Sequence, residues 1–323
     1  LPSSEEQYVV EGELPQWSVD GNRLAVQHEQ ELSVIDAATG KPVVAWQLPE
    51  EYHIAPGLYQ RNTAWSACGN YLLTHGPNSL AIWDATTGVE HWEIEGYVGE
   101  SHAWAPHGAL LATVADGIVS VWDAANTVHV SDVAEPSLRS PFFRVYWDPE
   151  ARRIATGGWD GFVEEWNAAA GQFIREYAGH APDHYLNTVA WDPTGRYMAS
   201  GGWDHSVIVW DTQTGELHEK FLGHNATILE LAFHPTQSRL ACADTSGRVK
   251  IWDLNSASET MALSWGESTL LGDHLIIAGD DEHGERSTLQ QRHGEWLEWA
   301  DDGRTLWVNN SGGLTIFEAG ADD

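Results

Sequence analysis

Short runs of apolar and polar residues, separated by turn residues, recur along the whole chain. The clearest copy lies at residues 189–211. Within it, Asp192-Pro193-Thr194-Gly195 is typical of a turn, because proline presets φ and glycine tolerates positive φ. Residues 196–200 have the length of a strand, and residues 207–210 add the β-branched and aromatic content of one. The pattern predicts three short strands joined by two tight turns, the second at residues 201–206.

Copies of this unit recur in the same phase through the chain. Successive first-strand aromatics in the first six copies lie from 39 residues apart (Trp65 to Trp104) to 48 residues apart (Trp17 to Trp65). Four-stranded propeller blades repeat about every 40–45 residues. The first strands carry Trp17, Trp65, Trp104, Trp147, Trp191, Phe233 and Trp299, and the third strands end at Ile35-Asp36, Trp83-Asp84, Trp122-Asp123, Trp166-Asn167, Trp210-Asp211, Trp252-Asp253 and Phe317-Glu318.

A further turn with Thr-Gly or a similar pair follows several of the third strands, as at residues 38–40 and 214–215. It leads into a fourth strand-like run, such as residues 43–46 or 216–221. No window of about a dozen residues carries a helical period with capping residues. The sequence therefore predicts an all-β fold built from four-stranded units.

Three features together resemble the WD-repeat (WD40) family over essentially the whole chain. Gly-His pairs stand near the start of two repeats, at residues 179–180 and 223–224, and Trp-Asp pairs end several third strands. A Gly-Gly-Trp-Asp turn occurs twice, at residues 157–160 and 201–204. The resemblance implies a closed seven-bladed β-propeller of four-stranded antiparallel blades, formed by a single domain over residues 1–323.

The two ends of the repeat array differ from the rest. The last copy ends without room for a fourth strand, whereas residues 6–11 form a strand-like run with no copy of their own. We therefore expect residues 6–11 to supply the outer strand of the last blade and close the ring. The interval from Trp252 to Trp299 is the longest of its kind, and we interpret residues 270–291 as an inserted hairpin. The alternative is an eight-bladed ring with one degenerate blade.

The resemblance also implies a buried polar network within a blade. In the family it joins a histidine before the first strand, a Ser or Thr in the second, an Asp in the next turn and the third-strand Trp. The fifth blade comes closest, with Ser200, Asp204, Trp210 and either His180 or His184.

Neighbouring blades retain parts of this network. The fourth has Thr156, Asp160 and Trp166, and the sixth has His224 and Trp252 but Cys242 and Ser246 at the Ser and Asp positions. Because the network decays toward both chain ends, we expect blades four to six to be the better-ordered half.

Partner binding in this family uses the narrow face of the propeller, around the residue before the turn Asp and beside the first-strand apolar residue. Trp159 and Trp203 occupy turns, where a large apolar side chain has little core to enter, and they predict an exposed aromatic patch. The alternative is that both indoles stack on neighbouring loops within the fold. By register, the candidate partner-binding residues are Trp159, Trp203, Phe143, Tyr185, Asn187, Thr227, Leu229 and Arg144.

Charge narrows the choice of partner. The chain has 48 acidic and 16 basic residues and a formal net charge of -32. This balance argues against nucleic acid and anionic membranes, since both need positive charge on the protein. It fits a very soluble protein, a basic partner or a saline environment, and these three interpretations stay open.

Cysteine content and apolar runs bear on location. Cys68 and Cys242 are the two cysteines, so we expect no disulfide framework and a cytoplasmic location. No apolar run approaches the roughly 18 residues of a membrane span. The sequence begins with Leu1 and has no signal peptide, which allows excision from a longer protein.

Catalytic signals are weak. No nucleophile elbow or phosphate-cradling loop occurs, and neither the histidines at 180 and 184 nor residues 280–283 form a complete metal-ligand set. We therefore expect a monomeric, non-catalytic scaffold that binds a protein or peptide and needs no metal or cofactor. The alternatives are a propeller that is an enzyme or binds a sugar or other small molecule, and a sensor module excised from a larger signalling or defence protein.

Overall fold

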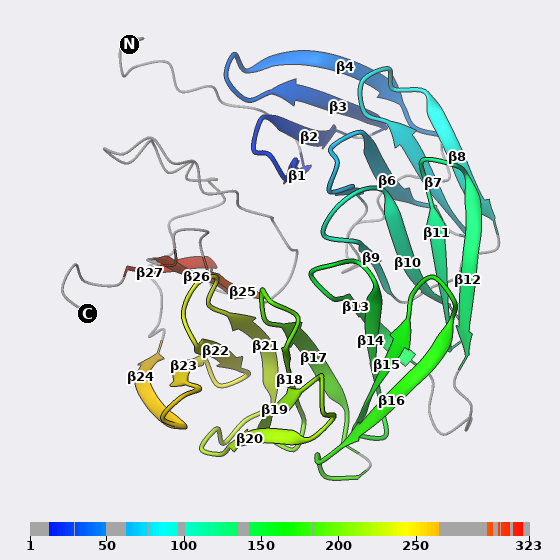
Figure 1. Ribbon diagram of the computed structural model, residues 1–323. Helices are drawn as coiled ribbons and strands as arrows, with labels where there is room; N and C mark the ends of the chain where they lie inside the picture. Colours follow the sequence, from blue (N-terminus) through cyan, green and yellow to red (C-terminus); the bar gives the residue numbers. More distant parts are fainter. Residues whose placement is uncertain are drawn as a thin grey trace. The chain divides into compact units, whose positions relative to one another are not determined.

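The computed structural model describes residues 13–28, 30–49, 63–76, 78–95, 101–115, 117–134, 142–182, 184–264, 296–299, 303, 305–310 and 313–318. Every regular element in these ranges is a β-strand, so the predicted all-β class is confirmed (Figure 1). The strands form two compact units, one within Leu1–Val98 and one that begins at Gly99. Residues 6–11 and 270–291, for which we predicted an outer strand and an inserted hairpin, lie outside the described residues.

The first unit contains two four-stranded antiparallel sheets, each with its strands in sequence order. Leu32 and Val34 of one sheet pack against Leu72 and Trp83 of the other. The indole N–H of Trp65 also donates a hydrogen bond to the carbonyl of Gln16 in the first sheet (2.9 Å). The strands are β1 (Glu13–Trp17), β2 (Arg23–His28), β3 (Glu31–Asp36), β4 (Lys41–Gln47), β5 (Thr63–Trp65), β6 (Tyr71–His75), β7 (Ser79–Asp84) and β8 (Glu90–Glu95).

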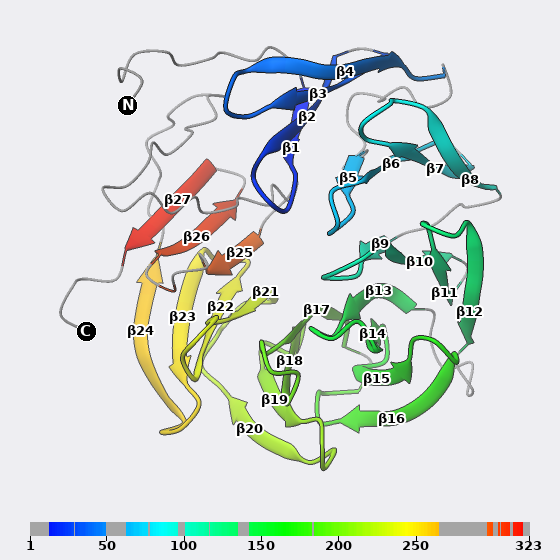
Figure 2. The same cartoon turned by 45° about the horizontal axis from the view of Figure 1, so that its top comes forward.

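The second unit contains four more four-stranded antiparallel sheets and, among the described residues, one three-stranded sheet. Figure 2 shows these sheets following one another, with the first strand of each on one side and the last strand on the other. The strands of its first two sheets are β9 (Ser101–Trp104), β10 (Leu110–Ala115), β11 (Ile118–Asp123), β12 (Val128–Ala134), β13 (Phe142–Trp147), β14 (Arg153–Gly158), β15 (Phe162–Asn167) and β16 (Gln172–Ala178). The remaining strands are β17 (Leu186–Trp191), β18 (Tyr197–Gly202), β19 (Val207–Asp211), β20 (Leu217–Phe221), β21 (Ile228–Phe233), β22 (Arg239–Asp244), β23 (Arg248–Asp253), β24 (Ser258–Ser264), β25 (Trp296–Trp299), β26 (Thr305–Asn310) and β27 (Gly313–Glu318).

Strand β18 is longer than the sequence predicted. Gly201 and Gly202 were assigned to a turn, but they continue the ladder, with Gly201 paired to Thr188 and Gly202 to Leu186. A methyl group on Gly201 would lie 2.6 Å from Cγ2 of Ile228 in the next sheet. The glycines therefore keep the strand while letting the neighbouring inner strand approach closely.

In the six four-stranded sheets, the third strand ends in a side chain that organises the following turn. Oδ1 of Asp84 accepts hydrogen bonds from the backbone N–H groups of Thr86 and Thr87 and from the Thr87 hydroxyl, at 2.8 to 3.0 Å. This local pairing explains why an acidic or amide residue follows the aromatic and a hydroxyl or amide residue often stands three positions later. Equivalent bonds from backbone N–H groups are accepted by Asp36, Asp123, Asn167, Asp211 and Asp253.

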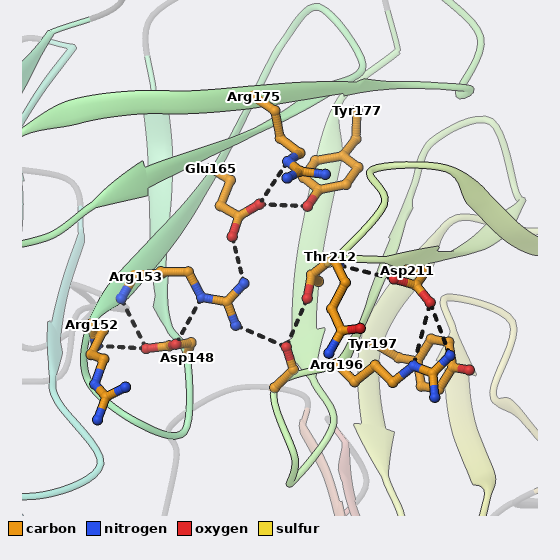
Figure 3. A network of polar contacts seen from close by, with 12 residues as sticks. Asp148, Arg152, Arg153, Glu165, Arg175, Tyr177, Arg196, Tyr197, Asp211 and Thr212 are labelled. Carbon is orange, nitrogen blue, oxygen red and sulfur yellow. Dashed lines mark hydrogen bonds and ion pairs between the residues drawn. The ribbon is translucent and has the colours of Figure 1, made fainter.

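A recurrent contact, which we call the turn clasp, ties one sheet to the next. In the second unit, Arg153 donates to the carbonyl of Gly195 in the first turn of the following sheet (2.8 Å), and its guanidinium lies over the Trp191 ring. Figure 3 shows the same guanidinium between the carboxylates of Asp148 and Glu165, at 3.0 and 2.7 Å. Both carboxylates are almost fully buried. One side chain thus satisfies two buried charges and a carbonyl across the boundary between sheets.

Two further turn clasps use the same geometry. In each, a donor beside the first turn of one sheet reaches a glycine carbonyl in the first turn of the next and lies against that sheet's first-strand Trp. All three glycines have φ near +69°, and in each a methyl group would press on the donor side chain. The contacts are Arg23 to Gly69 over Trp65, and His234 to Gly303 (2.9 Å) beside Trp299.

Candidate partner-binding site

The polar network of the sheet β17–β20 runs from the third strand to the turn after β18. The Trp210 indole donates to the Ser200 hydroxyl (3.0 Å), which lies 2.8 Å from Nε2 of His180. Nδ1 of His180 lies 3.0 Å from both carboxylate oxygens of Asp204. Of the two candidate histidines, His180 is thus the one in contact with Asp204, whereas His184 is exposed and bonds the Pro182 carbonyl.

Asp204 is held as a carboxylate. Burial alone would raise its pKa, but hydrogen bonds and the charge of His180, the Ala181 N–H and the Ser206 hydroxyl hold that pKa well below the usual aspartate value. Its side chain is only 7 % exposed. The turn that follows β18 is therefore fixed by a buried, fully bonded carboxylate.

Parts of the network recur in other sheets. The Trp166 indole donates to Thr156 in β13–β16 (3.0 Å), and Asp160 accepts the backbone N–H of Phe162. Two equivalent pairs, Trp83 with Thr74 and Trp122 with Thr113, were not predicted from the sequence. In both, the threonine lies nine positions before the tryptophan rather than ten, and a search with this spacing would have found them.

The sheet β21–β24 uses a different carboxylate. Nδ1 of His224 lies 2.6 Å from Asp244, at the end of β22, and Asp244 also accepts the Ser246 hydroxyl. Alignment by register pointed to Ser246 as the replacement for the turn aspartate and missed Asp244. Cys242 stands where the other sheet has Ser200.

Three aromatic side chains meet at the turns of two adjacent sheets. The ring centroid of Tyr185 lies 4.4 Å from that of Trp159 and 4.6 Å from that of Trp203, with interplanar angles of 63° and 51°. Trp159 is 46 % exposed and Trp203 is 52 % exposed. We call Trp159, Tyr185 and Trp203 the aromatic trio.

The paired glycines before each exposed tryptophan explain why the indoles face outward. Leu186 presses on Gly157, and a methyl group on Gly202 would collide with the Tyr185 carbonyl. That carbonyl accepts the backbone N–H of Trp203 (2.9 Å). Leu186 and Ile228, each from the first strand of the next sheet, lie over Gly157 and Gly201, so the space beside the second strand is filled and the tryptophan two positions later projects from the turn.

The other predicted binding residues lie on the first strands of their sheets or directly beside them. Asn187 uses its side-chain amide within the fold, donating to the carbonyl of Ile228 (2.8 Å). Arg144 is exposed on β13 and interacts electrostatically with Tyr146 and Glu230. Thr227 and Leu229 are part-exposed at the start of β21, and the side chain of Phe143 lies outside the part of the chain that the structure describes.

The repeated strands and turns correspond to a known protein family. The family model for the WD domain, G-beta repeat, matches residues 93–123, 171–211 and 215–253. These three segments are WD40 repeats. The second matched WD40 segment contains β16 of one sheet and β17 to β19 of the next, so one sequence repeat contributes strands to two sheets. This offset ties neighbouring sheets through the chain itself.

A solved structure supports the fold over most of the chain. A chain from "Crystal Structure of Mitotic Checkpoint Complex" superposes with a TM-score of 0.66 at 18 % identity, covering 95 % of this WD40 chain and 87 % of that chain. No curated protein sequence matches the chain. Within the described ranges, no helix is long and apolar enough to cross a membrane.

Proposed function

We propose that this WD40 protein is a non-catalytic scaffold that binds a protein or peptide partner through the aromatic trio. The exposure of two adjacent indoles carries the proposal, since about half of each is open to solvent. An aromatic side chain buries about 150–250 Å² in full, so covering the exposed halves yields about 2–3 kcal/mol per indole. Exposed aromatics of this kind are typical anchors of protein interfaces.

Rigid support strengthens this interpretation. Trp203 directly precedes Asp204, which is bonded to His180, Ser206 and the Ala181 N–H. A side chain on a fixed turn loses less conformational entropy on binding than one on a free loop. The aromatic trio is therefore pre-organised on one side of the turn by the network on the other.

The family and the structural relative agree with a scaffold role. WD40 proteins typically serve as interaction scaffolds and are generally non-catalytic, and the similar solved chain comes from a structure described as a complex. These similarities point to protein partners without naming one.

The proposal includes a closed seven-bladed ring with the aromatic trio on its narrow face. Six four-stranded sheets and the three-stranded sheet β25–β27 account for the described strands. A strand from residues 6–11 beside β27 would complete that last sheet and cover an otherwise unpaired edge.

A double variant tests the proposed surface. Trp159→Ala/Trp203→Ala should lose a partner that wild type retains in affinity capture. Leu222→Ala is the matched control, because Leu222 is 67 % exposed and is not part of the trio. A partner retained equally by wild type and the double variant would reject the surface.

A further inference from the structure

The aromatic trio lies on loops that carry negative charge. Asp160 follows Trp159 directly, and Asp204 follows Trp203 directly. Residues 157–162, 179–188 and 200–206, which include the turns around the trio and the adjoining strand ends, contain no Lys or Arg. Lys220 of β20 donates to the Gly179 carbonyl at the edge of this region (2.9 Å), and the chain as a whole carries a net charge of -32.

Exposed indoles on a strongly acidic protein favour a cationic ligand. The face of an indole attracts an ammonium or guanidinium group by about 0.5–1 kcal/mol at exposed sites and about 2 kcal/mol once water is excluded. Both indoles lie at an angle to the Tyr185 ring rather than flat against it. Such a surface can contact a flat guanidinium or a lysine stem on more than one side.

The charge of the chain decides between kinds of partner. An acidic segment would meet repulsion from the excess of carboxylates, which slows encounter and weakens the complex. Arg144, on β13 of the sheet that carries Trp159, interacts electrostatically with Tyr146 and Glu230. A basic segment is attracted over long range and gains cation–π contacts once it arrives.

We propose that the aromatic trio receives an arginine or lysine side chain from a basic segment of a partner protein. This inference rests on the proposed function and specifies the chemistry of the partner. The indoles of Trp159 and Trp203 contact the cationic side chain, while the net charge of -32 of the chain supplies the long-range attraction.

Labelled peptides test this chemistry directly. The probes are fluorescein-labelled Gly/Ser peptides that carry arginines, lysines or glutamates at the same positions, followed by fluorescence polarisation. Wild type should bind the arginine and lysine peptides, with weaker binding when salt is raised from about 0.05 to 0.3 M, and should not bind the glutamate peptide. Trp159→Ala/Trp203→Ala should weaken binding about tenfold or more, in line with two lost cation–π contacts.

Replacing the two tryptophans by alanine distinguishes binding at the aromatic trio from general attraction of the peptide to the acidic protein. The double variant keeps the net charge, so any loss of affinity comes from the indoles. Leu222→Ala should bind as wild type does. Equal binding by wild type and the double variant would overturn the inference, as would the lack of tryptophan-dependent binding up to about 1 mM peptide.

The two proposals fail in different ways. In one outcome, a natural partner needs both tryptophans yet binds through an uncharged segment and independently of salt. That result would contradict the basic-segment inference but would agree with the proposed surface. A partner that ignores both tryptophans sinks the surface itself.

Discussion

The neighbouring sheets β17–β20 and β21–β24 share strand register but differ in how they satisfy their buried polar groups. In the first, hydrogen bonds join Trp210, Ser200, His180 and Asp204 in an unbroken series. In the second, Cys242 replaces the serine, and a thiol is a weak hydrogen-bonding group. Within the described residues, Nε2 of His224 and Nε1 of Trp252 have no hydrogen-bond partner.

The position of the carboxylate also sets what the turn presents to solvent. With Gly202 at the end of β18, the carboxylate lies in the turn at Asp204 and Trp203 projects outward. The matching position of β22 is Asp244, whose carboxylate bonds His224 directly. Thr245 occupies the position of the exposed tryptophan. The comparison teaches that the buried network and the exposed indole are two consequences of one turn.

The largest expected effect is at Asp204. Asp204→Ala removes a buried carboxylate and leaves His180 and Ser206 without their acceptor, which should cost about 3 kcal/mol of unfolding free energy. Asp211→Ala is the matched control in the same sheet, where the carboxylate serves an exposed turn and should cost about 0.5–1 kcal/mol. Chemical denaturation followed by circular dichroism measures both. Equal losses would refute the assignment of Asp204 to a stabilising network.

Exchanging serine and cysteine between the two sheets should change the stability of the protein in opposite directions. Cys242→Ser offers a hydroxyl to the unpaired nitrogens of His224 and Trp252 and should stabilise the protein by about 1–2 kcal/mol. Ser200→Cys breaks the complete network and should destabilise it by a similar amount. Both variants keep nearly the same side-chain volume, so packing changes little. Shifts of the same sign in the two variants would show that hydrogen bonding does not explain the difference.

The smallest expected effect is the loss of stability in mildly acidic solution. Burial lowers the pKa of His224, with Asp244 opposing it, so the unfolded chain binds a proton more readily than the folded one. Its contribution to stability is complete above the unfolded pKa, about 6.5, and is lost as pH falls below it. The lowered pKa of Asp204 makes its contribution constant until pH falls below about 4. Mild acid therefore weakens β21–β24 before β17–β20.

Thermal unfolding between pH 7.5 and 5 checks this order. Wild type should lose more stability over that interval than His224→Gln, which cannot take up the proton. Burial lowers the pKa of His75 to about 4, so His75 contributes in both proteins and cancels in the difference. Parallel pH profiles of the two proteins would contradict the role of His224.

Local sequence chemistry was sufficient for the strands, the repeat and the two exposed tryptophans. Turn residues and β-branched runs act over a few neighbours, and a tryptophan in a Gly-Gly-Trp-Asp turn has no core to enter. The same logic missed Asp244, because its carboxylate works two positions before the place that register assigns. It also left His180 and His184 undecided, since a choice between two loop histidines depends on the loop's path.

Contacts between sheets could not be predicted from the sequence and became visible only in the structure. The turn clasp from Arg153 to Gly195 joins residues 42 positions apart, and the glycine's role depends on where that guanidinium lies. Asn187 looked like a binding residue by position, yet its amide is committed to the neighbouring strand. Such pairings depend on the distance between sheets, which a single repeat pattern does not encode.

The most direct test of the central claim observes the indoles themselves. With 5-fluorotryptophan incorporated at all 18 tryptophans, single Trp→Phe variants identify the ¹⁹F signals of Trp159 and Trp203. Titration with the arginine peptide should shift these two signals together and saturably, while most other indoles stay unchanged. Shifts at other tryptophans with these two unmoved would contradict the account.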